Sequence, residues 1–394
     1  MKGSVIIVGA GIIGAACART LSRRGLDVTI VDAGASAGAT SSSGEGNLLV
    51  SDKGPGAELE LAQHSLRLWR TLAPTLESEI GRDFPSVEFE RKGGIVAALD
   101  AQQSQALDLF ADAQRRAGVD AQRLSADEAR YLEPELSPAI SSGVYYPEDA
   151  QVQPTIAAEA FLASARAAGT RVLVNTVVTG PLIDADGKLA GVVTSSGNLA
   201  ADDVVVAAGP WAGEVAQVLG GTLSVGPRKG FLLVTSRMPR RIFHKVYDAD
   251  YVGAVGSDNH DLQTSTVIES TASGTVLIGS SRQNVGFDSG LDVAALRKIA
   301  AKAVRLMPFL LETSVIRAYC GFRPFARDHV PVIGPDPAVP GLWYAAGHEG
   351  AGIGLAPATA EMLASLMLGE SPAVAAALFA PGRASLADSL AGTA

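Results

Sequence analysis

Apolar residues near the start of the chain fall into two uninterrupted runs separated by a stretch with helical spacing. Residues 5–8 are all β-branched (Val-Ile-Ile-Val), which predicts a strand buried on both faces. Apolar residues then recur at helical spacing over residues 12–22. A second run, residues 28–31, leads directly to Asp32. This order predicts a strand–helix–strand unit within a parallel sheet.

Three glycines connect the first predicted strand to the helix, in the pattern Gly9-x-Gly11-x-x-Gly14. Gly9 allows a tight turn, Gly11 lets the backbone approach a diphosphate, and Gly14 lets the helix pack closely on the strand. The helix start offers free N–H groups to the diphosphate, and Asp32 is placed to accept a hydrogen bond from a ribose. The unit predicts a dinucleotide site formed by Gly9, Gly11, Ile12, Ile13, Gly14 and Asp32.

The apolar start also admits a second interpretation, a secretory or lipoprotein leader from Met1 to Cys17. One lysine precedes the apolar run, three glycines interrupt it at the nucleotide-binding spacing, and it continues into a second strand. We therefore favour the dinucleotide site.

A loop rich in small residues follows Asp32 and extends to Leu48. Its Ser, Thr and Gly residues suit close contact with a cofactor, although a flexible surface loop has the same composition. Its position directly after the second strand favours cofactor contact. The candidates are Thr40, Ser41, Ser42, Gly44, Glu45, Gly46, Asn47 and Leu48.

The period of the apolar pattern changes along the rest of the chain. A buried strand over residues 204–208 ends at Gly209-Pro210-Trp211, as expected at the centre of a parallel sheet. Residues 227–286 form strands with short turns, which predicts a second domain rich in β-structure. We predict helices over residues 58–79, 101–117, 154–168 and 292–307, and strands over residues 87–91, 94–98, 171–178, 231–235, 264–269 and 275–280.

Near the C-terminus a strand again ends in glycines and opens a helix. Residues 342–346 lead into the glycine cluster of residues 347–354 and then into a helical stretch over residues 356–367. This helix start provides a second set of N–H donors for a cofactor. We expect the last dozen residues of the chain to be poorly ordered.

Composition excludes several classes of protein. The chain has 394 residues, 47% hydrophobic and 19% charged, which is enough for two globular domains. A net charge of −9 argues against a nucleic-acid partner. Cys17 and Cys320 are too few for a disulfide framework or an iron–sulfur or zinc site, so we expect no metal and a reducing, cytoplasmic setting. No uninterrupted apolar stretch approaches the length of a membrane span.

Together these segments resemble the D-amino acid oxidase superfamily of flavoenzymes, most closely its glycine oxidase branch, with the sarcosine oxidases as relatives. The branch includes subunits of the hydrogen-cyanide-synthase, opine-oxidase and hydroxyproline-dehydrogenase types. The resemblance implies FAD rather than NAD as the cofactor, because nicotinamide enzymes lack the C-terminal glycine cluster. It is carried by residues 9–14, 40–47, 204–211, 321–324 and 347–357.

The resemblance implies an α/β fold with a discontinuous FAD-binding domain of the Rossmann-like, glutathione-reductase type. That domain would comprise residues 1–85, 145–226 and 318–380. A discontinuous, β-rich α+β substrate domain would comprise residues 86–144 and 227–317, and residues 381–394 would form a C-terminal tail.

The resemblance also implies roles for individual residues. The loop from Thr40 to Leu48 would contact the flavin and the diphosphate, and Val177 would present its backbone to the adenine. Arg323, in the sequence Gly-x-Arg-Pro, would hold the substrate carboxylate, a task that suits its planar fork. The rest of the implied FAD site is Ala208, Gly209, Trp211, Arg323, Gly347, His348, Gly350, Gly352, Ile353, Gly354 and Leu355.

Three positions depart from the family pattern. Asp32 stands where family members usually carry Glu. Gly350 occupies the position of a second substrate-contacting arginine of glycine oxidase, which suggests a substrate larger than glycine. Cys320 lies where monomeric sarcosine oxidases attach FAD covalently; we favour a buried, inert thiol and keep a thioether link as the alternative.

Beside Arg323, we select Tyr251 and His348 as candidate catalytic or substrate-contacting residues. Each also has an interpretation as a packing or solvated residue. The same two interpretations apply to the further candidates Tyr247, His244 and Arg282, whereas His64 and Trp69 look structural.

The leading hypothesis is an FAD-dependent oxidase of a glycine-like or N-substituted amino acid with a free carboxylate. In the family, a hydride moves from the substrate carbon to the flavin, and the imine hydrolyses to a keto acid and an amine. A dehydrogenase subunit for D-amino acids, hydroxyproline or opines is the second hypothesis, and a flavin-binding scaffold without turnover is the third. The amine substituent, the electron acceptor and any homo-oligomeric state stay open.

Overall fold

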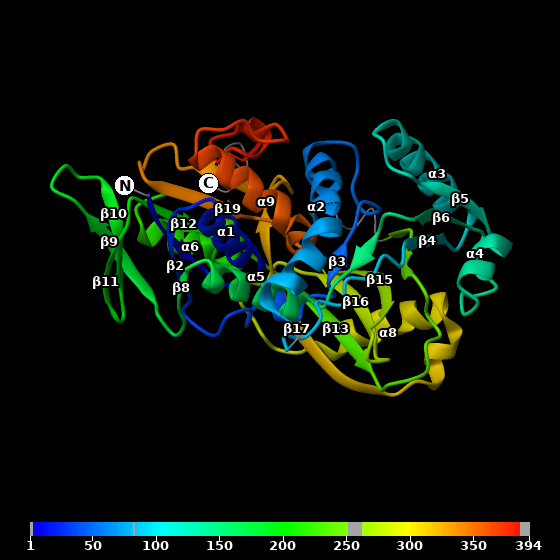
Figure 1. The fold of residues 1–394 in the computed structure, drawn as a ribbon. Helices are drawn as coiled ribbons and strands as arrows, with labels where there is room; N and C mark the ends of the chain where they lie inside the picture. Colours follow the sequence, from blue (N-terminus) through cyan, green and yellow to red (C-terminus); the bar gives the residue numbers. More distant parts are fainter. Residues whose placement is uncertain (1–2, 82, 251–261, 387–394) are drawn as a thin grey trace.

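The computed structural model describes residues 3–81, 83–250 and 262–386 and contains two large sheets side by side (Figure 1). Among the described residues, one sheet has six strands in the order β18-β19-β12-β1-β2-β8, and the other has eight in the order β17-β13-β16-β15-β14-β4-β6-β5. The predicted α/β fold with a Rossmann-like sheet and a second β-rich sheet is confirmed.

The six-stranded sheet begins with the predicted strand–helix–strand unit. Its parallel strands are β1 (Ser4–Val8), β2 (Asp27–Val31), β8 (Arg171–Leu173), β12 (Asp203–Val206) and β19 (Leu342–Ala346), and β18 (Val332–Pro335) runs antiparallel at one edge. Alternate residues face opposite sides of the sheet, and both sides are covered, which explains the uninterrupted apolar runs.

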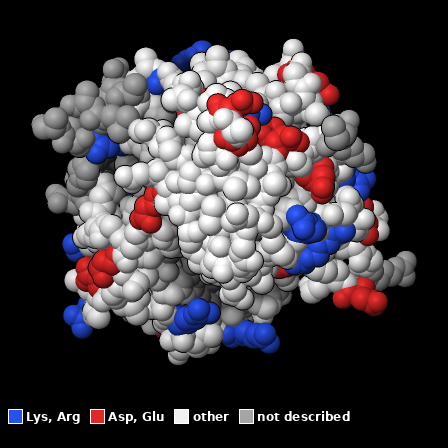
Figure 2. Space-filling model, turned by 90° about the vertical axis from the view of Figure 1, so that its left-hand side faces the viewer, with Lys and Arg blue, Asp and Glu red and all other residues white. Residues whose placement is uncertain are grey.

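One side of this sheet carries long helices and the other carries a small sheet. Val5 and Ile7 pack against helices α1 (Ile12–Arg23), α5 (Pro154–Ala167) and α9 (Gly352–Met367). Ile6 and Val8 face the opposite core, which is formed with α6 (Ala212–Val218) and the meander β9 (Val178–Ile183), β10 (Leu189–Thr194) and β11 (Gly197–Ala200). Figure 2 shows the meander side of the molecule, where acidic and basic side chains are scattered between wide uncharged areas.

The eight-stranded sheet combines two distant parts of the chain. It contains β4 (Gly94–Ala98), β5 (Gln122–Ser125), β6 (Ser142–Tyr146), β13 (Val225–Thr235), β14 (Lys245–Asp248), β15 (Gln263–Ser270), β16 (Val276–Arg282) and β17 (Val315–Ala326). Helix α8 (Val293–Leu306) covers the face to which Phe231 and Leu233 point. By the two-residue period of a strand, Gly230 and Leu232 point to the other face. That face is where the cavity described below is found.

Shorter elements connect these layers. They are α3 (Ala101–Arg116), α4 (Ala126–Leu132), the strand pair β3 (Asn47–Leu48) and β7 (Ala150–Gln151), and the 3₁₀ turns η1 (Thr40–Ser43), η2 (Gly209–Trp211), η3 (Pro308–Glu312) and η4 (Ala376–Phe379).

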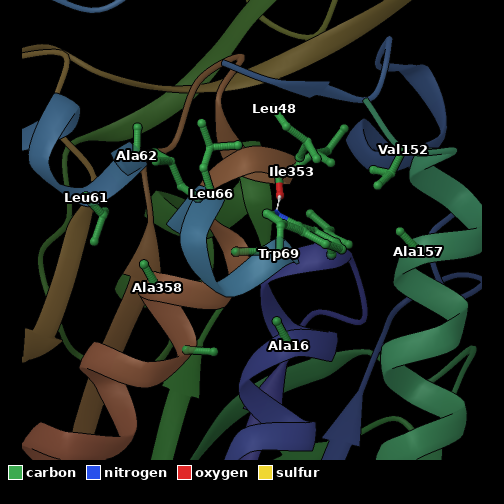
Figure 3. Close-up of a cluster of buried hydrophobic side chains, with 14 of the residues drawn as sticks. Ala16, Leu48, Leu61, Ala62, Leu66, Trp69, Val152, Ala157, Ile353 and Ala358 are labelled. Carbon is green, nitrogen blue, oxygen red and sulfur yellow. Dashed lines mark hydrogen bonds between the residues drawn. The ribbon is translucent and has the colours of Figure 1, made fainter. Parts of the chain in front are cut away.

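Helix α2 (Ala57–Ile80) packs against α9 and α5 and fixes the start of α9 (Figure 3). Pro357 has no N–H, so the carbonyl of Ile353 lacks its helical donor. The fully buried Trp69 supplies one, since its Nε1 donates to that carbonyl at 3.2 Å. Ser65 Oγ donates to the carbonyl of Gly354 at 2.6 Å. Trp69 is structural, as predicted, and it secures the first turn of a helix that borders the cavity.

Two predicted strands are wrong, for the same physical reason. Residues 87–91 form only an isolated bridge at Glu90, because Glu88 has a left-handed backbone with φ +53°. The predicted strand 171–178 is split into β8 and the start of β9, because Asn175 has φ +52°. A single left-handed residue ends a strand, and the apolar pattern does not show it.

The predicted domain boundary near residue 318 and the predicted C-terminal tail also differ from the structure. β17 pairs with β13 in the larger sheet, so the domain boundary that we place at residue 318 falls inside one strand. The division into two discontinuous domains stays a proposal.

Within the predicted tail, Arg383 is paired with Asp328 and Leu386 is buried, so residues 383–386 are packed rather than loose. Residues 387–394 lie outside the described part of the chain.

In the described part of the chain, no helix is both long enough and apolar enough to cross a membrane. The same residues contain no group of three or more His, Cys, Asp or Glu side chains placed to hold a metal ion.

Candidate active site

A cavity of about 690 Å³ is lined from both sheets and from the loop that follows Asp32. It brings together segments that are more than three hundred residues apart in the sequence. The predicted site residues that line it are Gly9, Gly11, Ile12, Ile13, Asp32, Thr40, Ser41, Gly44, Glu45, Asn47, Val177, Ala208, Gly209, Trp211, Arg323, His348, Gly350, Gly352 and Ile353.

Other predicted residues lie behind the cavity wall and shape its backbone. A Cβ on Gly14 would lie 1.9 Å from the carbonyl oxygen of Gly9, and one on Gly46 would lie 1.9 Å from that of Val152. Both glycines therefore permit close backbone packing rather than offer a surface to a ligand. The remaining predicted residues outside the lining are Ser42, Leu48, Gly347, Gly354 and Leu355, and Tyr251 lies outside the described residues.

The dinucleotide motif has the geometry that it predicts. Gly9 has φ +112°, which a side chain would strain. The first N–H groups of any helix lack intrahelical acceptors, and Gly11, which precedes helix α1, has no side chain to cap them. The hydroxyl of Ser41, in the following loop, accepts from the N–H of Ile12 at 2.9 Å. The turn, the bare glycine and the open helix start fit a diphosphate.

Asp32 ties this turn to the next loop. Its Oδ2 accepts from the N–H of Ala10 at 2.7 Å, and its Oδ1 accepts from the N–H of Gly34 at 2.8 Å. Each carboxylate oxygen can accept a further hydrogen bond. The bond to a ribose, which we expect from the sequence, stays a prediction.

The loop from η1 to β3 lies directly on the larger sheet, over positions that have no side chain. Thr40 Oγ1 donates to the carbonyl of Phe322 at 2.7 Å. A Cβ on Gly321 of β17 would lie 2.6 Å from the Cβ of Ser43, and one on Gly279 of β16 would lie 2.2 Å from Oε1 of Glu45. These glycines let the loop form one wall of the cavity.

Arg323 projects from β17 across the neighbouring strand β13. Its Nη1 donates to the carbonyl of Ser281 at 2.8 Å, and a Cβ on Gly230 would lie 2.2 Å from that nitrogen. A Cβ on Gly350 would lie 3.5 Å from its Nε, which is ordinary contact. The guanidinium thus lines the cavity, with open space on the side where residue 350 has no side chain.

His348 lines the cavity but is only 2% exposed. Its Nε2 lies 2.9 Å from Oγ1 of Thr359 in α9, and burial lowers the pKa of the imidazole to about 3. The ring is therefore neutral near pH 7, which favours a positioning role over proton donation. Its Nδ1 and the Oδ1 of Asn47 are buried without a hydrogen-bond partner among the described residues, as expected of atoms that meet a cofactor.

Other candidates lie away from the cavity lining. His244 pairs with Glu133, with Nδ1 and Oε1 2.9 Å apart, while Tyr247 and Arg282 are buried in the larger sheet. Cys320 precedes the cavity-lining Gly321 in β17, so its side chain points to the opposite face, where its Sγ lies 3.4 Å from the carbonyl of Ser289. Cys320 is half-buried, so the expectation of a buried thiol is wrong, but its orientation favours the inert thiol over a thioether link.

Sequence reasoning missed several lining residues because they reach the cavity through tertiary contacts. Thr176 follows the left-handed break after β8, and three residues come from α6, the helix that follows Trp211. The α6 residues follow the central strand β12, and Thr176 follows the edge strand β8; position after a strand of the parallel sheet is their only sequence signal. The principal additions are Gly34, Thr176, Glu214, Val215, Val218, Gly230, Leu232, Phe322 and Glu349.

The fold and the cavity define a dinucleotide-binding protein. Residues 4–366 match the family model described as FAD dependent oxidoreductase, and the chain belongs to this family. The glycine oxidase of Pseudomonas aeruginosa is 32% identical over 390 residues, which cover 97% of this chain and 99% of that protein. A hydrogen cyanide synthase subunit of the same organism is 30% identical over 387 residues, covering 89% of this chain and 88% of that protein.

A solved structure of a glycine oxidase has the same fold. The crystal structure of glycine oxidase from Geobacillus kaustophilus has a TM-score of 0.86 at 28% sequence identity, covering 97% of this chain and 99% of that chain. The predictions of FAD as cofactor and of an FAD-dependent enzyme of the amino acid oxidase type are confirmed by these similarities.

Proposed function

We propose that this enzyme oxidises the Cα–N bond of a glycine-like or N-substituted amino acid. The observation that carries the proposal is the setting of Arg323, whose guanidinium lines the cavity beside the side-chain-free Gly350. A planar fork of donors suits a carboxylate, and the open space beside it suits a substituent on the amine.

Bound FAD would supply the hydride acceptor for this reaction. Gly9, Gly11 and the start of α1 would hold its diphosphate, and the start of α9 would border its ring end. The residues of the chain then need to orient the substrate and exclude water, because the flavin carries the redox chemistry. For an N-carboxymethyl amine, hydrolysis of the imine leaves glyoxylate and the free amine.

Anaerobic bleaching of the flavin tests the proposal directly. We expect N-carboxymethyl amines and sarcosine to bleach it faster than glycine, with D-amino acids and proline as the remaining members of the panel. In Arg323→Ala, bleaching should be lost while the purified protein stays yellow. Normal bleaching in that variant would contradict the carboxylate assignment, and a flavin that no amino acid reduces would favour a scaffold without turnover.

A dehydrogenase subunit for D-amino acids, hydroxyproline or opines that passes electrons to a partner is the second candidate, because one relative at 30% identity is itself a subunit, that of a hydrogen cyanide synthase. Oxygen consumption with the best bleaching substrate separates the two. An oxidase consumes oxygen without any added acceptor, whereas a dehydrogenase subunit needs an artificial dye for sustained turnover.

A further inference from the structure

Glu45 is a cavity-lining carboxylate that the amino acid oxidation as proposed above does not use. It is held on two sides: its Oε2 accepts from Nδ2 of Asn47 at 3.1 Å, and its Oε1 lies against Gly279, where a Cβ would come within 2.2 Å. Oε1 is shielded from solvent and accepts no hydrogen bond among the described residues. A buried carboxylate oxygen without a donor is costly, so a donor from a ligand would satisfy it.

Glu45 and Arg323 lie on the same face of the larger sheet. The Nη1 of Arg323 lies over Gly230, whereas Glu45 lies over Gly279, whose Cβ position is 3.1 Å from the side chain of Leu232. Gly230 and Leu232 are two residues apart on β13, a spacing of ~7 Å along the strand. Side chains that lie over positions this far apart can both reach one amino acid, because its carboxylate and its amine are carried by the same α-carbon and each hydrogen bond adds ~2.8 Å.

The charges around Glu45 suit a proton acceptor. Burial raises the pKa of its carboxyl above the usual range, and the cations that face it, Lys245 on β14, Arg323 on β17 and Arg282 on β16, oppose that rise. The phenol of Tyr319 on β17 also faces Glu45, and burial raises the pKa of Tyr319 to about 12. Lys245 is itself buried and paired with Glu269, and burial lowers the pKa of Lys245 to about 7. A carboxyl with a raised pKa transfers protons near neutral pH better than an ordinary exposed one.

We propose that Glu45 binds the substrate amine and accepts its proton, while Arg323 holds the carboxylate. One N–H bond of the bound ammonium breaks, an O–H bond forms at Oε1 of Glu45, and the electron pair stays on nitrogen. The neutral amine then has the lone pair that assists hydride departure from the α-carbon. The step needs no other reactant, and it rests on the proposed amino acid oxidation.

The pH dependence of kcat/KM in the holoenzyme tests this role, using the substrate that bleaches the wild-type flavin fastest. The wild-type profile should be bell-shaped, rising with the ionisation of Glu45 and falling above the pKa of the free substrate amine. Glu45→Gln can use only neutral amine. Its kcat/KM should be ~100-fold or more below that of the wild type near pH 7 and should recover steadily as the pH approaches the pKa of the substrate amine.

Three comparisons make the outcome decisive. Glu45→Asp retains a carboxylate and should keep a bell-shaped profile at reduced kcat, and Glu60→Gln, an exposed change on α2, should match the wild type. Titration of the flavin spectrum with acetate, which has no amine, should give a similar affinity in Glu45→Gln and wild type, and a weakened one in Arg323→Ala. Acetate binding also shows that Glu45→Gln keeps a folded site.

An unchanged profile in Glu45→Gln, or an equal loss at every pH, would overturn the role of Glu45. If no amino acid bleaches the wild-type flavin, the proposed function fails instead, so the two failures are distinguishable.

Discussion

The Nη1 of Arg323 occupies the space that a side chain on Gly230 would fill, since a Cβ there would lie 2.2 Å from that nitrogen and 2.7 Å from the carbonyl oxygen of Ser281. Gly230→Ala should therefore displace the guanidinium and lower kcat/KM by ~10- to 100-fold, because misplacement by about 1 Å is costly in an active site. Gly226→Ala is the matched control on β13, where nothing lies within 4 Å. Steady-state kinetics and flavin content are the measurements; equal kinetics in the two variants would contradict the crowding argument.

Gly350 should set the range of substrates. Its Cβ position is 3.5 Å from Nε of Arg323, so an alanine fits and a leucine fills the space beside the guanidinium. We expect Gly350→Leu to lower kcat/KM for N-substituted substrates at least ~10-fold more than for glycine, whereas Gly350→Ala changes the ratio little. If Gly350→Leu leaves the ratio of the two kcat/KM values unchanged, the substituent on the amine does not lie beside Gly350.

Trp69 should matter for stability more than for chemistry. Trp69→Phe keeps most of the buried ring but removes the donor to the carbonyl of Ile353, which Pro357 cannot serve. Leaving a buried carbonyl unpaired should lower the free energy of unfolding by about 1–3 kcal/mol. Denaturant unfolding of the holoenzyme measures this loss. Trp343→Phe, which removes a donor to Asp203 near the surface, serves as the comparison and should cost less.

Asp149 should make the stability depend on pH. Its Oδ1 accepts from the N–H groups of Val50 and Ser51, yet burial raises its pKa to about 7. Because that value lies above the ordinary ~3.9 of an unfolded Asp, the stabilisation is complete below pH ~4 and is lost as the pH rises through 7. Asp149→Asn should remove this slope, which amounts to ~1.4 kcal/mol per pH unit at most within that window. Unfolding curves at pH 5 and 8 test it; a variant with the wild-type slope would show that other groups cause the dependence.

Cys320 should leave FAD dissociable. Its side chain points away from the cavity-lining face of β17, so denaturation should release all of the flavin. The intact mass of the denatured protein should equal that of the polypeptide, and an added flavin mass would contradict this orientation.

Local signals in the sequence predicted the first nucleotide-binding unit well. The strand run, the glycine spacing and Asp32 lie within one short segment, so chain geometry alone brings them together. The structure also contains a capping box from Ser125 to Glu128, a local feature whose two partners belong to one turn. The strand break at Glu88 was not predictable, because glutamate rarely adopts a left-handed backbone. Asn175 carries a weak signal, since asparagine is enriched in that region, but the apolar pattern around it hides the break.

The sequence by itself determined the dinucleotide motif, the two kinds of sheet and, through the family pattern, FAD as the cofactor, and it selected Arg323 as the candidate for the substrate carboxylate. Only the tertiary structure placed Gly230 beneath the Arg323 guanidinium and Gly279 against Glu45. The physical reason is that strand register pairs residues far apart in the sequence, such as Gly230 with Gly321. Hydrophobic periodicity tells which face a residue occupies, but not which residue of a distant strand lies beside it.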